Sequence, residues 1–520
     1  MLSLFYLLSM ASCNALLPRA ACSGNTATTR SQWCEYSVDT NYYDEVPDTG
    51  VVREYTFDLV ELTASPDGFP RTVYAFNGIV PGPTIEADWG DTVVVHINNN
   101  LTLAKNGTSV HFHGIRQNYS NGMDGVTSIT QCPLPPGDSM TYTWRATQYG
   151  TSWYHSHIGL QAFDGAAGAI KINGPATANY DVDVGTIMLS DWTHKTVDSL
   201  YSEELTRGPS FLDNGLINGT NTWTNGGMIV IAADFVPIVP YETTVLDIGM
   251  GQRYDVIVRA DQQSVAQNFW MRAIPQFSCS LNSNKDNIRG IIYYGSEAST
   301  PATSAYPYID SCVDEPANNL VPHLVLSAGQ QEQSDLEPVG LSPTDDVILW
   351  AMDKTSFYAN WENPTLLQIY NNDTSYTRRS HVISLDKANS WVYVIIEATN
   401  AIPHPIHLHG HDFSIVGQGP GPFVRSKNLF SLTNPMRRDV AMLPGSGHLV
   451  LAFKTDNPGA WLMHCHIGWH TDMGLALQFV ERVEEARELI DFDYLDNNCA
   501  KWREYTELAS VEQEKYDDGI

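Results

Sequence analysis

A single cysteine lies between two histidines in the run WLMHCHIGWH, residues 461–470. The apolar residues before it predict a β-strand that ends in a loop, and neighbouring side chains on a strand point to opposite faces. We therefore expect Cys465 to face one way, and His464 and His466 to face the other. A thiolate with imidazoles and a weak or open axial position is the ligand set of a type 1 blue copper site. If both faces bind metal, the backbone here is a short covalent path between two sites.

Three more histidine motifs share the His-x-His spacing: SVHFHG (His111, His113), WYHSH (His155, His157) and HPIHLHGH (His404, His407, His409, His411). Both imidazoles of such a motif lie on one face of a strand, about 7 Å apart at the backbone, which suits one metal ion or two neighbouring ions. One motif alone is more often a polar strand face than a metal site. Four together, one of them enclosing a cysteine, indicate metal binding.

Copper is the metal that this donor set favours. Structural zinc often takes several cysteines, whereas only one cysteine lies among these imidazoles. Copper also binds nitrogen and sulfur sites more tightly than zinc does. The remaining histidines are interpreted as ordinary side chains: His96, His194, His323, His381, His411 and His448.

Short stretches of alternating apolar and polar residues must position these motifs. They fill residues 51–172, about 180–294 and 345–483, with Pro-Gly and Gly-Asp between them, and predict an all-β protein of sandwiches or barrels. Residues 301–340 are rich in Ser, Pro and acids and predict a linker. The expected organisation is a signal peptide at 1–20, domains at 21–175, 176–300 and 341–483 around that linker, and a charged, partly helical tail at 484–520.

The chain length, the composition and the net charge narrow the possible functions. A chain of 520 residues with 43% hydrophobic residues suggests about three domains. The net charge of −30 is spread along the chain without a basic patch, which argues against nucleic acids and anionic membranes as partners.

The N-terminus MLSLFYLLSMASCNA predicts a signal peptide, cleaved near Ala15 or Ala20, and no later stretch predicts a transmembrane helix. Five Asn-x-Ser/Thr sites fit a secreted glycoprotein: Asn100, Asn106, Asn118, Asn218 and Asn372.

Six of the eight cysteines remain once Cys13 leaves with the signal peptide and Cys465 is set aside as a ligand. An even set in an oxidising compartment predicts three disulfides among Cys22, Cys34, Cys132, Cys279, Cys312 and Cys499. Spacing alone leaves 15 pairings open.

The four motifs resemble those of the multicopper oxidases, and closely those of ascomycete fungal laccases, from about Tyr55 to the end of the chain. The resemblance implies three cupredoxin-like Greek-key β-sandwich domains and four copper ions. His404, Cys465 and His470 look like type 1 ligands, and His111 and His407 look like type 2 ligands. The remaining histidines look like ligands of the type 3 pair: His113, His155, His157, His409, His464 and His466.

The resemblance also implies a reaction. A phenol or aromatic amine near His470 gives up one electron at a time, electrons pass through Cys465 to His464 and His466, and four of them reduce dioxygen to water. The metals carry the redox chemistry, while the protein sets potential and access. The family's axial position, ten residues after the cysteine, is Leu475 here. Leucine cannot ligate, which implies a fairly high potential.

Two residues near the motifs have competing interpretations. Trp469 beside His470 would wall the substrate site, or it is an ordinary packing residue. Asp124, in the run MDGVTS, matches a family acid near the oxygen-reducing site and is a candidate for proton delivery. Asp124 is equally well placed as a turn residue in Met-Asp-Gly.

By the same resemblance, Cys132 would pair with Cys499, Cys279 with Cys312, and Cys22 with Cys34. The last four residues, Asp517 to Ile520, resemble a C-terminus that enters the solvent channel of these enzymes, although Asp518 replaces a serine of the family pattern. A disordered acidic tail is the alternative.

The second domain departs from the family pattern. INGTNTW, residues 217–223, is joined by TNGGMI directly to the strand that follows, so a few dozen residues are expected to be missing. The missing part includes the segment whose carboxylate contacts the phenol in related laccases. Loss of strands would expose sheet edges and empty part of a core.

Three functions are therefore compared. The first is a secreted laccase, expected to be a monomer as its three-domain relatives commonly are. The second is a metal-ion oxidase such as a ferroxidase, which needs acids beside the type 1 histidines; Asp472 is the only acid close to them in sequence. The third is a copper-binding protein without turnover, inactivated by the shortened second domain.

Overall fold

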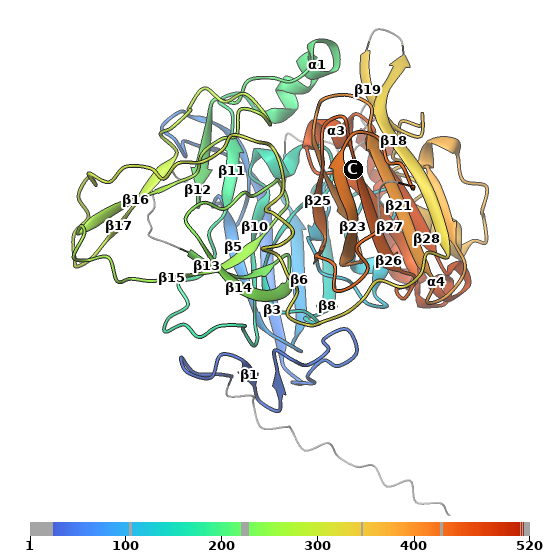
Figure 1. Ribbon diagram of the computed structural model, residues 1–520. Coiled ribbons are helices and arrows are strands. Elements are labelled where there is room, and N and C mark those ends of the chain that lie inside the picture. The colour runs from blue at the N-terminus through green and yellow to red at the C-terminus, as the bar shows by residue number, and fades with distance from the viewer. Residues whose placement is uncertain are drawn as a thin grey trace, which may run out of the picture.

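The computed structural model describes residues 24–102, 107–219, 228–344, 347–426 and 430–509, with 511 and 513, and these are mostly β-strand (Figure 1). Several predicted features lie outside the described residues: the signal peptide at 1–20 with Cys13, then Cys22, Asn106, the bridging segment at 220–227, and the terminus from Asp517 to Ile520. None of the described helices is long and apolar enough to cross a membrane.

The N-terminal sandwich consists of two four-stranded sheets. The first has the order β4-β3-β6-β8, formed by Arg71–Phe76, Val52–Ala64, Thr92–Asn99 and Ser139–Arg145. The second has the order β5-β10-β9-β7, formed by Gly82–Asp88, Ala167–Asn173, Gly150–Ser156 and Val110–Phe112. Side chains of β6 alternate strictly between buried and partly exposed, as a strand over a core requires. A small hairpin, β1 (Gln32–Trp33) and β2 (Tyr36–Ser37), precedes the sandwich.

The middle region has only small sheets. They are β11-β12 (Leu189–Trp192, Asn214–Ile217), β14-β13-β15 (Val236–Thr243, Met228–Ala233, Tyr254–Val258) and β16-β17 (Asn268–Arg272, Arg289–Tyr293). Helix α1, Val197–Arg207, lies between β11 and β12. Many buried residues of this region belong to its neighbours' cores: Val230 and Ile238 pack with the C-terminal strands, and Leu216 packs with β4. A shortened second domain stays a prediction, since 220–227 is not described.

The C-terminal sandwich consists of a six-stranded and a five-stranded sheet. The first has the order β19-β18-β21-β26-β23-β24, formed by Val347–Met352, Gln333–Thr344, Trp391–Ala398, Gly447–Lys454, Phe413–Pro420 and Arg437–Arg438. The second has the order β20-β28-β27-β22-β25, formed by Val382–Leu385, Ala476–Glu481, Gly459–Cys465, His404–Leu408 and Val440–Leu443. Strand β18 begins inside the range predicted as a linker.

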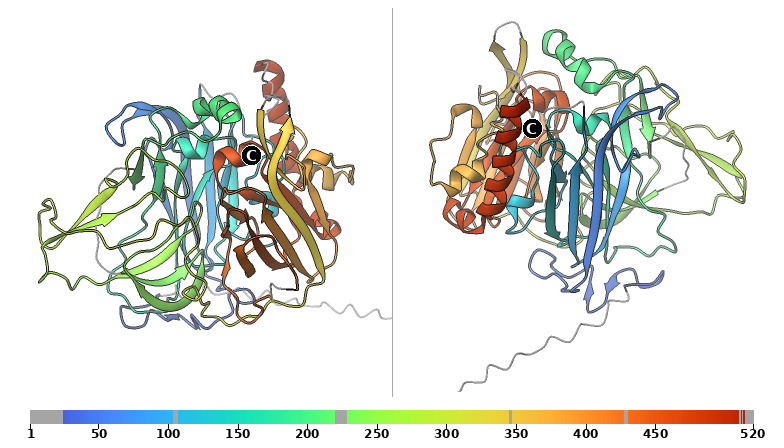
Figure 2. Two further views of the ribbon diagram at one scale, coloured as in Figure 1. Left: turned by 45° about the horizontal axis from the view of Figure 1, so that its top comes forward. Right: turned by 180° about the vertical axis from the view of Figure 1, so that it is seen from behind.

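Short helical elements join and extend these sandwiches. The 3₁₀ turns are η1 (Asn121–Met123), η2 (Gln161–Asp164) and η3 (Arg378–Ser380), and the short helices are α2 (Thr365–Tyr370), α3 (Gly468–Asp472) and α4 (Val483–Leu489). The tail contains helix α5, Phe492–Ala509, which lies where the two sandwiches meet (Figure 2) and packs against residues of both.

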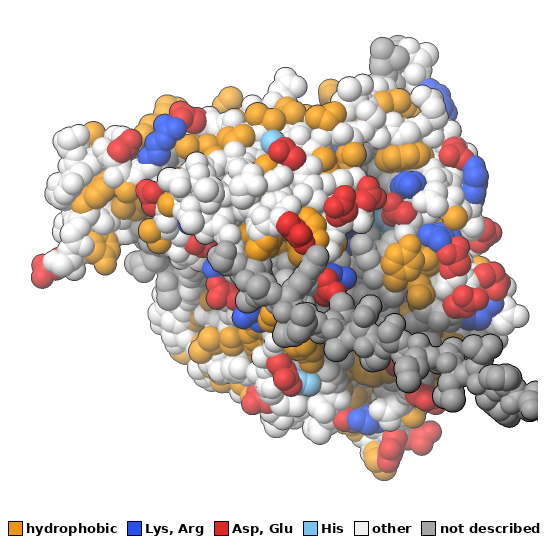
Figure 3. Space-filling model, turned by 90° about the horizontal axis from the view of Figure 1, so that it is seen from below, with side chains coloured by type: hydrophobic (Ala, Val, Ile, Leu, Met, Phe, Trp, Pro, Cys, Tyr) orange, Lys and Arg blue, Asp and Glu red, His pale blue; other side chains and the backbone are white. Residues whose placement is uncertain are grey.

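An apolar interface joins the N- and C-terminal sandwiches. Val126, Ile129 and Ile158 from the first pack with Phe357 and Leu462 from the second, and all five are buried. Burial of such surface stabilises the contact by about 25 cal/mol per Å². The interface therefore fixes the relative position of the two sandwiches that carry the histidine motifs. On the face shown in Figure 3, acidic and basic side chains are interspersed.

Two disulfides pair as the resemblance implied, Cys132–Cys499 and Cys279–Cys312. Cys34 is also disulfide-bonded, while its expected partner Cys22 lies outside the described residues. Cys132–Cys499 ties α5 to the N-terminal sandwich over a sequence separation of 367 residues, against 33 for Cys279–Cys312.

Replacing both Cys132 and Cys499 by Ala should lower the free energy of unfolding more than replacing Cys279 and Cys312. A cross-link that closes a longer loop removes more entropy from the unfolded chain, by about 2 kcal/mol more for this pair of loops in the chain-entropy model. Thermal unfolding midpoints under non-reducing conditions compare the two double variants. Equal midpoints would show that loop length does not govern these cross-links.

Candidate metal centre

Cys465 forms a compact, buried group with two histidines. Its Sγ lies 3.7 Å from Nδ1 of His404 and 3.6 Å from Nδ1 of His470, and the two nitrogens are 3.1 Å apart. All three residues are buried. Donors at these separations leave room for a metal ion about 2 Å from each, which is the usual metal–nitrogen distance.

Strand register and one helical turn assemble this group. Strand β27 pairs with β22 so that Ile406 lies opposite Cys465 and His407 lies opposite His464. Helix α3 then returns the chain so that His470 faces Cys465, and Thr471 Oγ1 donates a hydrogen bond to the Cys465 carbonyl. Leu475 is buried, and its carbonyl accepts a hydrogen bond from the Cys465 amide.

The sequence prediction missed an aromatic neighbour of this group. The Trp350 ring, on β19, lies 4.7 Å from the His404 ring and 4.5 Å from the His470 ring between centroids. No motif contains Trp350, so no local pattern indicates its role. Packing of this kind fixes the orientation of both imidazoles.

Eight of the nine remaining motif histidines, all except His411, form a second cluster between the two sandwiches. Each of four strands supplies one histidine within the strand and one just beyond its end: β7 (His111, His113), β9 (His155, His157), β22 (His407, His409) and β27 (His464, His466). His111 lies opposite His155 in the N-terminal sandwich, as His407 lies opposite His464 in the C-terminal one. The two histidine pairs thus face each other across the interface.

Ligand atoms in this cluster converge into three groups made of histidines alone, and the atoms of each group lie within 4.8 Å of one another; a further group joins Asp124 to His111 and His409. The three histidine groups are His111–His113–His407, His113–His155–His466 and His157–His409–His464. Every group takes histidines from both sandwiches. Cys465 belongs to the separate group described above, whereas His464 and His466 belong to this cluster, as the alternation of side chains on a strand predicts.

Oxygen acceptors set the orientation of most of these imidazoles. Nδ1 lies 2.8 Å from the Asp124 carbonyl in His111, 2.8 Å from the Asp439 carbonyl in His407 and 2.9 Å from Asp124 Oδ2 in His409. A carbonyl or carboxylate oxygen only accepts, so each Nδ1 carries the hydrogen and each Nε2 keeps its lone pair. His155 and His464 are held in the same way by the carbonyls of Ser156 and Cys465.

His113 is reversed relative to these five. Its Nε2 lies 3.3 Å from Asp439 Oδ1, and its Nδ1 lies 3.2 Å from Nε2 of His466. Asp439 in turn accepts hydrogen bonds from both terminal nitrogens, Nη1 and Nη2, of the Arg253 guanidinium. Neither Asp439 nor Arg253 belongs to a histidine motif, and a single sequence carries no signal that brings them here.

Burial keeps the imidazoles neutral. It lowers the pKa of His404 from 6.5 to about 3 and that of His464 to about 4, and it lowers the pKa of His113, His407 and His466 well below the usual value. Burial also raises the pKa of the Cys465 thiol, so a bound cation is needed to hold it as thiolate. Neutral imidazoles with lone pairs directed inward are suited to metal binding.

Sequence profiles described as multicopper oxidase match residues 59–177, 224–297 and 352–485. Laccase-2 of Botryotinia fuckeliana is 45% identical over 94% of this chain and 92% of its own length. The chain belongs to the multicopper oxidase family.

Further relatives specify the type of oxidase. The laccase of Neurospora crassa is 37% identical over 92% of this chain and 87% of its own. The crystal structure of the laccase from Botrytis aclada superposes with a TM-score of 0.90 at 43% identity, covering 96% of this chain and all of that one. Fet3p, a multicopper oxidase that functions in iron import, gives 0.77 at 26% identity, covering 89% and 96%. The cupredoxin-like fold and a laccase-type oxidoreductase are thus confirmed.

The buried nitrogens of this oxidase fit copper. Among the described residues, Nε2 of His111, His155, His157 and His407 is buried without a hydrogen-bond partner. Such atoms are costly in a protein interior unless they are paired or coordinate a metal. Imidazole and thiolate donors are those that copper prefers.

The structure also places the remaining predicted residues of the oxidase. Asp124 is fully buried and contacts both His111 and His409, whereas a simple turn residue would be exposed. Trp469 is partly exposed and donates a long hydrogen bond to the Val197 carbonyl of α1. Four predicted glycosylation sites are exposed: Asn100, Asn118, Asn218 and Asn372.

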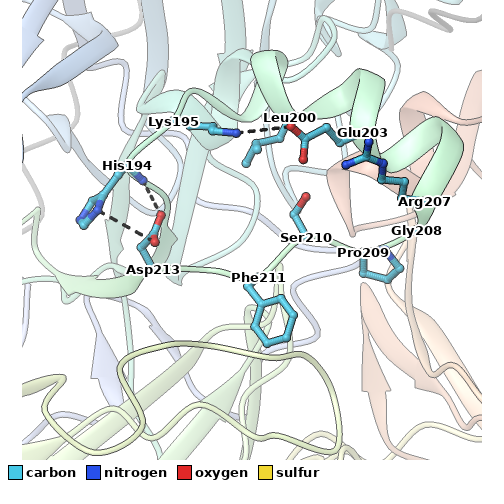
Figure 4. Close-up of a pocket in the computed structure, with 10 residues that line it drawn as sticks. All are labelled: His194, Lys195, Leu200, Glu203, Arg207, Gly208, Pro209, Ser210, Phe211 and Asp213. Carbon is cyan, nitrogen blue, oxygen red and sulfur yellow. Dashed lines mark hydrogen bonds and ion pairs between the residues drawn. The ribbon is translucent and has the colours of Figure 1, made fainter.

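A pocket of about 490 Å³ lies beside α1 in this oxidase (Figure 4). Leu200, Glu203 and Arg207 of α1 line one side, and Phe211 and Asp213 line another. Helix α1 also reaches α3, because the Tyr201 hydroxyl donates to the Asp472 carbonyl. The pocket is therefore next to the helix that packs on the His470 segment.

The lowered pKa values of the buried histidines should make the copper-free oxidase less stable as the pH is lowered from about 6.5 to about 4. In this window the unfolded histidines bind protons, while His404 and His464, with lowered pKa values, stay neutral in the folded protein. The unfolded state therefore gains protons first and is favoured. Urea unfolding midpoints across the range test this, and a midpoint that does not change below pH 6.5 would contradict it.

Proposed function

We propose that the protein is a secreted laccase that oxidises phenols or aromatic amines one electron at a time and reduces dioxygen to water with four electrons. One observation carries the proposal: Cys465 belongs to one metal group, while its two sequence neighbours belong to the other. Two sites joined in this way suit a reaction that takes electrons from a substrate at one place and delivers them elsewhere. The laccases among its relatives support the substrate class.

Four copper ions are assigned to the groups. His404, Cys465 and His470 would hold the type 1 ion, and His111 and His407 would hold the type 2 ion. The type 3 pair would be held by His113, His155 and His466 on one side, and by His157, His409 and His464 on the other. When bound, these ions supply one-electron redox chemistry and the site of dioxygen reduction.

The chain provides two connections out of Cys465. One runs along the backbone to His464 and His466. The other is a hydrogen bond of 2.9 Å from His464 Nδ1 to the Cys465 carbonyl, which shortens the route to the cluster. Both connections are buried and held by the register of β27, so they do not depend on a mobile segment.

The surroundings of Cys465 favour a substrate that donates electrons without binding to the metal. Leu475 and Trp350 are apolar and buried, which excludes water and favours a high potential. Trp469, a partly exposed residue of α3 that contacts α1, would wall the approach of a phenol to His470. The group of His404, Cys465 and His470 contains no carboxylate among the described residues, which disfavours a ferroxidase.

Asp124 is proposed to deliver protons during dioxygen reduction. Its Oδ2 contacts His409, and its Oδ1 lies 3.3 Å from Nδ1 of His111 and has no hydrogen-bond partner among the described residues. A buried carboxyl with one unpaired oxygen inside the cluster can take up and release a proton without moving.

The cellular context is proposed from the sequence. The expected signal peptide, the exposed glycosylation sites and the disulfides all suit an oxidising extracellular environment. Three cupredoxin-like domains with the predicted boundaries, and a monomeric state, complete the proposal.

Copper-loaded protein should show the strong blue absorption of a thiolate–copper site and should take up oxygen with a simple phenol but not with Fe(II). Cys465→Ser should abolish the blue colour and phenol oxidation, because the thiolate ligand is lost. The variant should bind one copper fewer per chain, because the histidine cluster does not include Cys465 and keeps its own ions. Absorption, metal content and oxygen uptake measure the three effects. Blue protein without oxygen uptake would indicate a copper-binding protein, and faster oxidation of Fe(II) would indicate a metal-ion oxidase.

Asp124→Asn should slow reoxidation by dioxygen at least about tenfold while phenol still bleaches the blue colour at the normal rate, because an amide cannot donate and recover a proton. Stopped-flow spectroscopy separates these two half-reactions. The variant should also lose the pH dependence of reoxidation. Turnover that equals the wild type at every pH would exclude Asp124 as a proton donor.

A further inference from the structure

The middle region reaches the histidine cluster although it supplies none of its histidines. The chain segment before β15, residues 249–253, lies against the cluster. A Cβ at Gly251, whose φ is +82°, would lie 2.8 Å from Cδ2 of His466, so only glycine fits there. Two residues later Arg253 extends to Asp439, next to β25 of the C-terminal sandwich.

Arg253 and Asp439 form a buried, bidentate ion pair. Nη1 of Arg253 contacts Oδ1 of Asp439, Nη2 lies 2.6 Å from Oδ2, and both side chains are nearly inaccessible to solvent. Gly114, the residue after His113, makes this geometry possible because a Cβ there would lie 2.4 Å from Nη2 of Arg253 and 2.5 Å from Oδ2 of Asp439. A two-point contact fixes both the position and the plane of the carboxylate.

Asp439 contacts two histidines from different sandwiches. Its carboxylate Oδ1 lies 3.3 Å from Nε2 of His113, whereas its backbone carbonyl lies 2.8 Å from Nδ1 of His407. The 3.3 Å contact lacks hydrogen-bond geometry, but the negative charge beside Nε2 favours hydrogen on that nitrogen, so His113 presents the Nδ1 lone pair toward His466, which lies 3.2 Å away. This explains why His113 is oriented opposite to the five histidines whose Nδ1 faces an oxygen.

We propose that Arg253 is a positioning residue for the oxygen-reducing cluster, acting through Asp439 to fix the tautomer and orientation of His113. The inference deepens the proposed laccase function and rests on the copper assignment made there. It also gives the middle region a role in the chemistry: this region contributes the fixed charge that orients a ligand shared between the other two domains.

The alternative is that the Arg253–Asp439 pair only stabilises packing, and another buried ion pair of the chain provides the control. Arg71 of β4 binds Asp164 of η2 at 2.6 Å within the N-terminal domain, and this pair is as buried as Arg253–Asp439. Asp164 caps the amide of Val197 in α1 but contacts no cluster histidine among the described residues. Loss of Arg71 therefore measures the effect of breaking a buried ion pair alone.

The test compares copper-loaded, full-length wild type with Arg253→Met, Arg253→Lys and the control Arg71→Met. Arg253→Met should lose cluster copper to a chelator 10–100-fold more readily, an effect usual for residues that orient metal ligands, and should keep the blue colour of the Cys465 site. Its anaerobic bleaching by phenol should stay within about twofold of wild type, while reoxidation by dioxygen slows about tenfold or more. Arg253→Lys, which keeps the charge but not the two-point contact, should be intermediate.

Arg71→Met should retain copper and reoxidise like wild type, even where its thermal midpoint falls. Equal loss of cluster copper in Arg71→Met and Arg253→Met would overturn the proposal, as would wild-type copper retention in Arg253→Met. If Arg253→Met does not fold, Arg253→Lys decides, and wild-type behaviour of that variant overturns the proposal. Wild-type protein that binds copper but consumes no oxygen would overturn the laccase function instead, while the comparison of copper retention still decides the role of Arg253.

Discussion

The structure depends on keeping eight imidazoles neutral, buried and correctly turned at the contact between two sandwiches. A buried imidazole with an unpaired nitrogen is unfavourable, and here several lone pairs converge on one volume. Carbonyl and carboxylate oxygens at Nδ1 resolve the conflict by fixing which nitrogen carries hydrogen. The apolar interface around Val126, Phe357 and Leu462 excludes water and holds the two halves in place.

Strand register explains why the histidines have the spacing that the sequence shows. His407 lies opposite His464 on neighbouring strands, and each strand places its second histidine just past its end, where the backbone is free to turn the ring inward. A shift of one residue in β27 would exchange the faces of Cys465 and His464 and would destroy both sites at once. The dense packing of β27 between β22 and β28 therefore protects the chemistry as much as the fold.

Sequence reasoning predicted the features that rest on local periodicity. Alternation placed Cys465 apart from His464 and His466, short alternating runs predicted the all-β fold, and motif resemblance predicted two disulfide pairs that the structure contains. It missed Trp350, Asp439 and Arg253, because their roles arise from contacts between strands and domains that no local pattern records. The shortening of the second domain stays a prediction, and the part of that domain around Arg253 contacts the cluster through Asp439.

The division of the cluster between the two ends of the chain has a consequence for biosynthesis. His113 and His466 are 353 residues apart, yet their nitrogens are in contact. A ribosome that has completed the first sandwich has made only half of the copper-binding surface, and the other half emerges near the end of translation. A complete cluster therefore forms only after the two sandwiches have docked, and a chain truncated before His404 would lack at least one ligand of every histidine group.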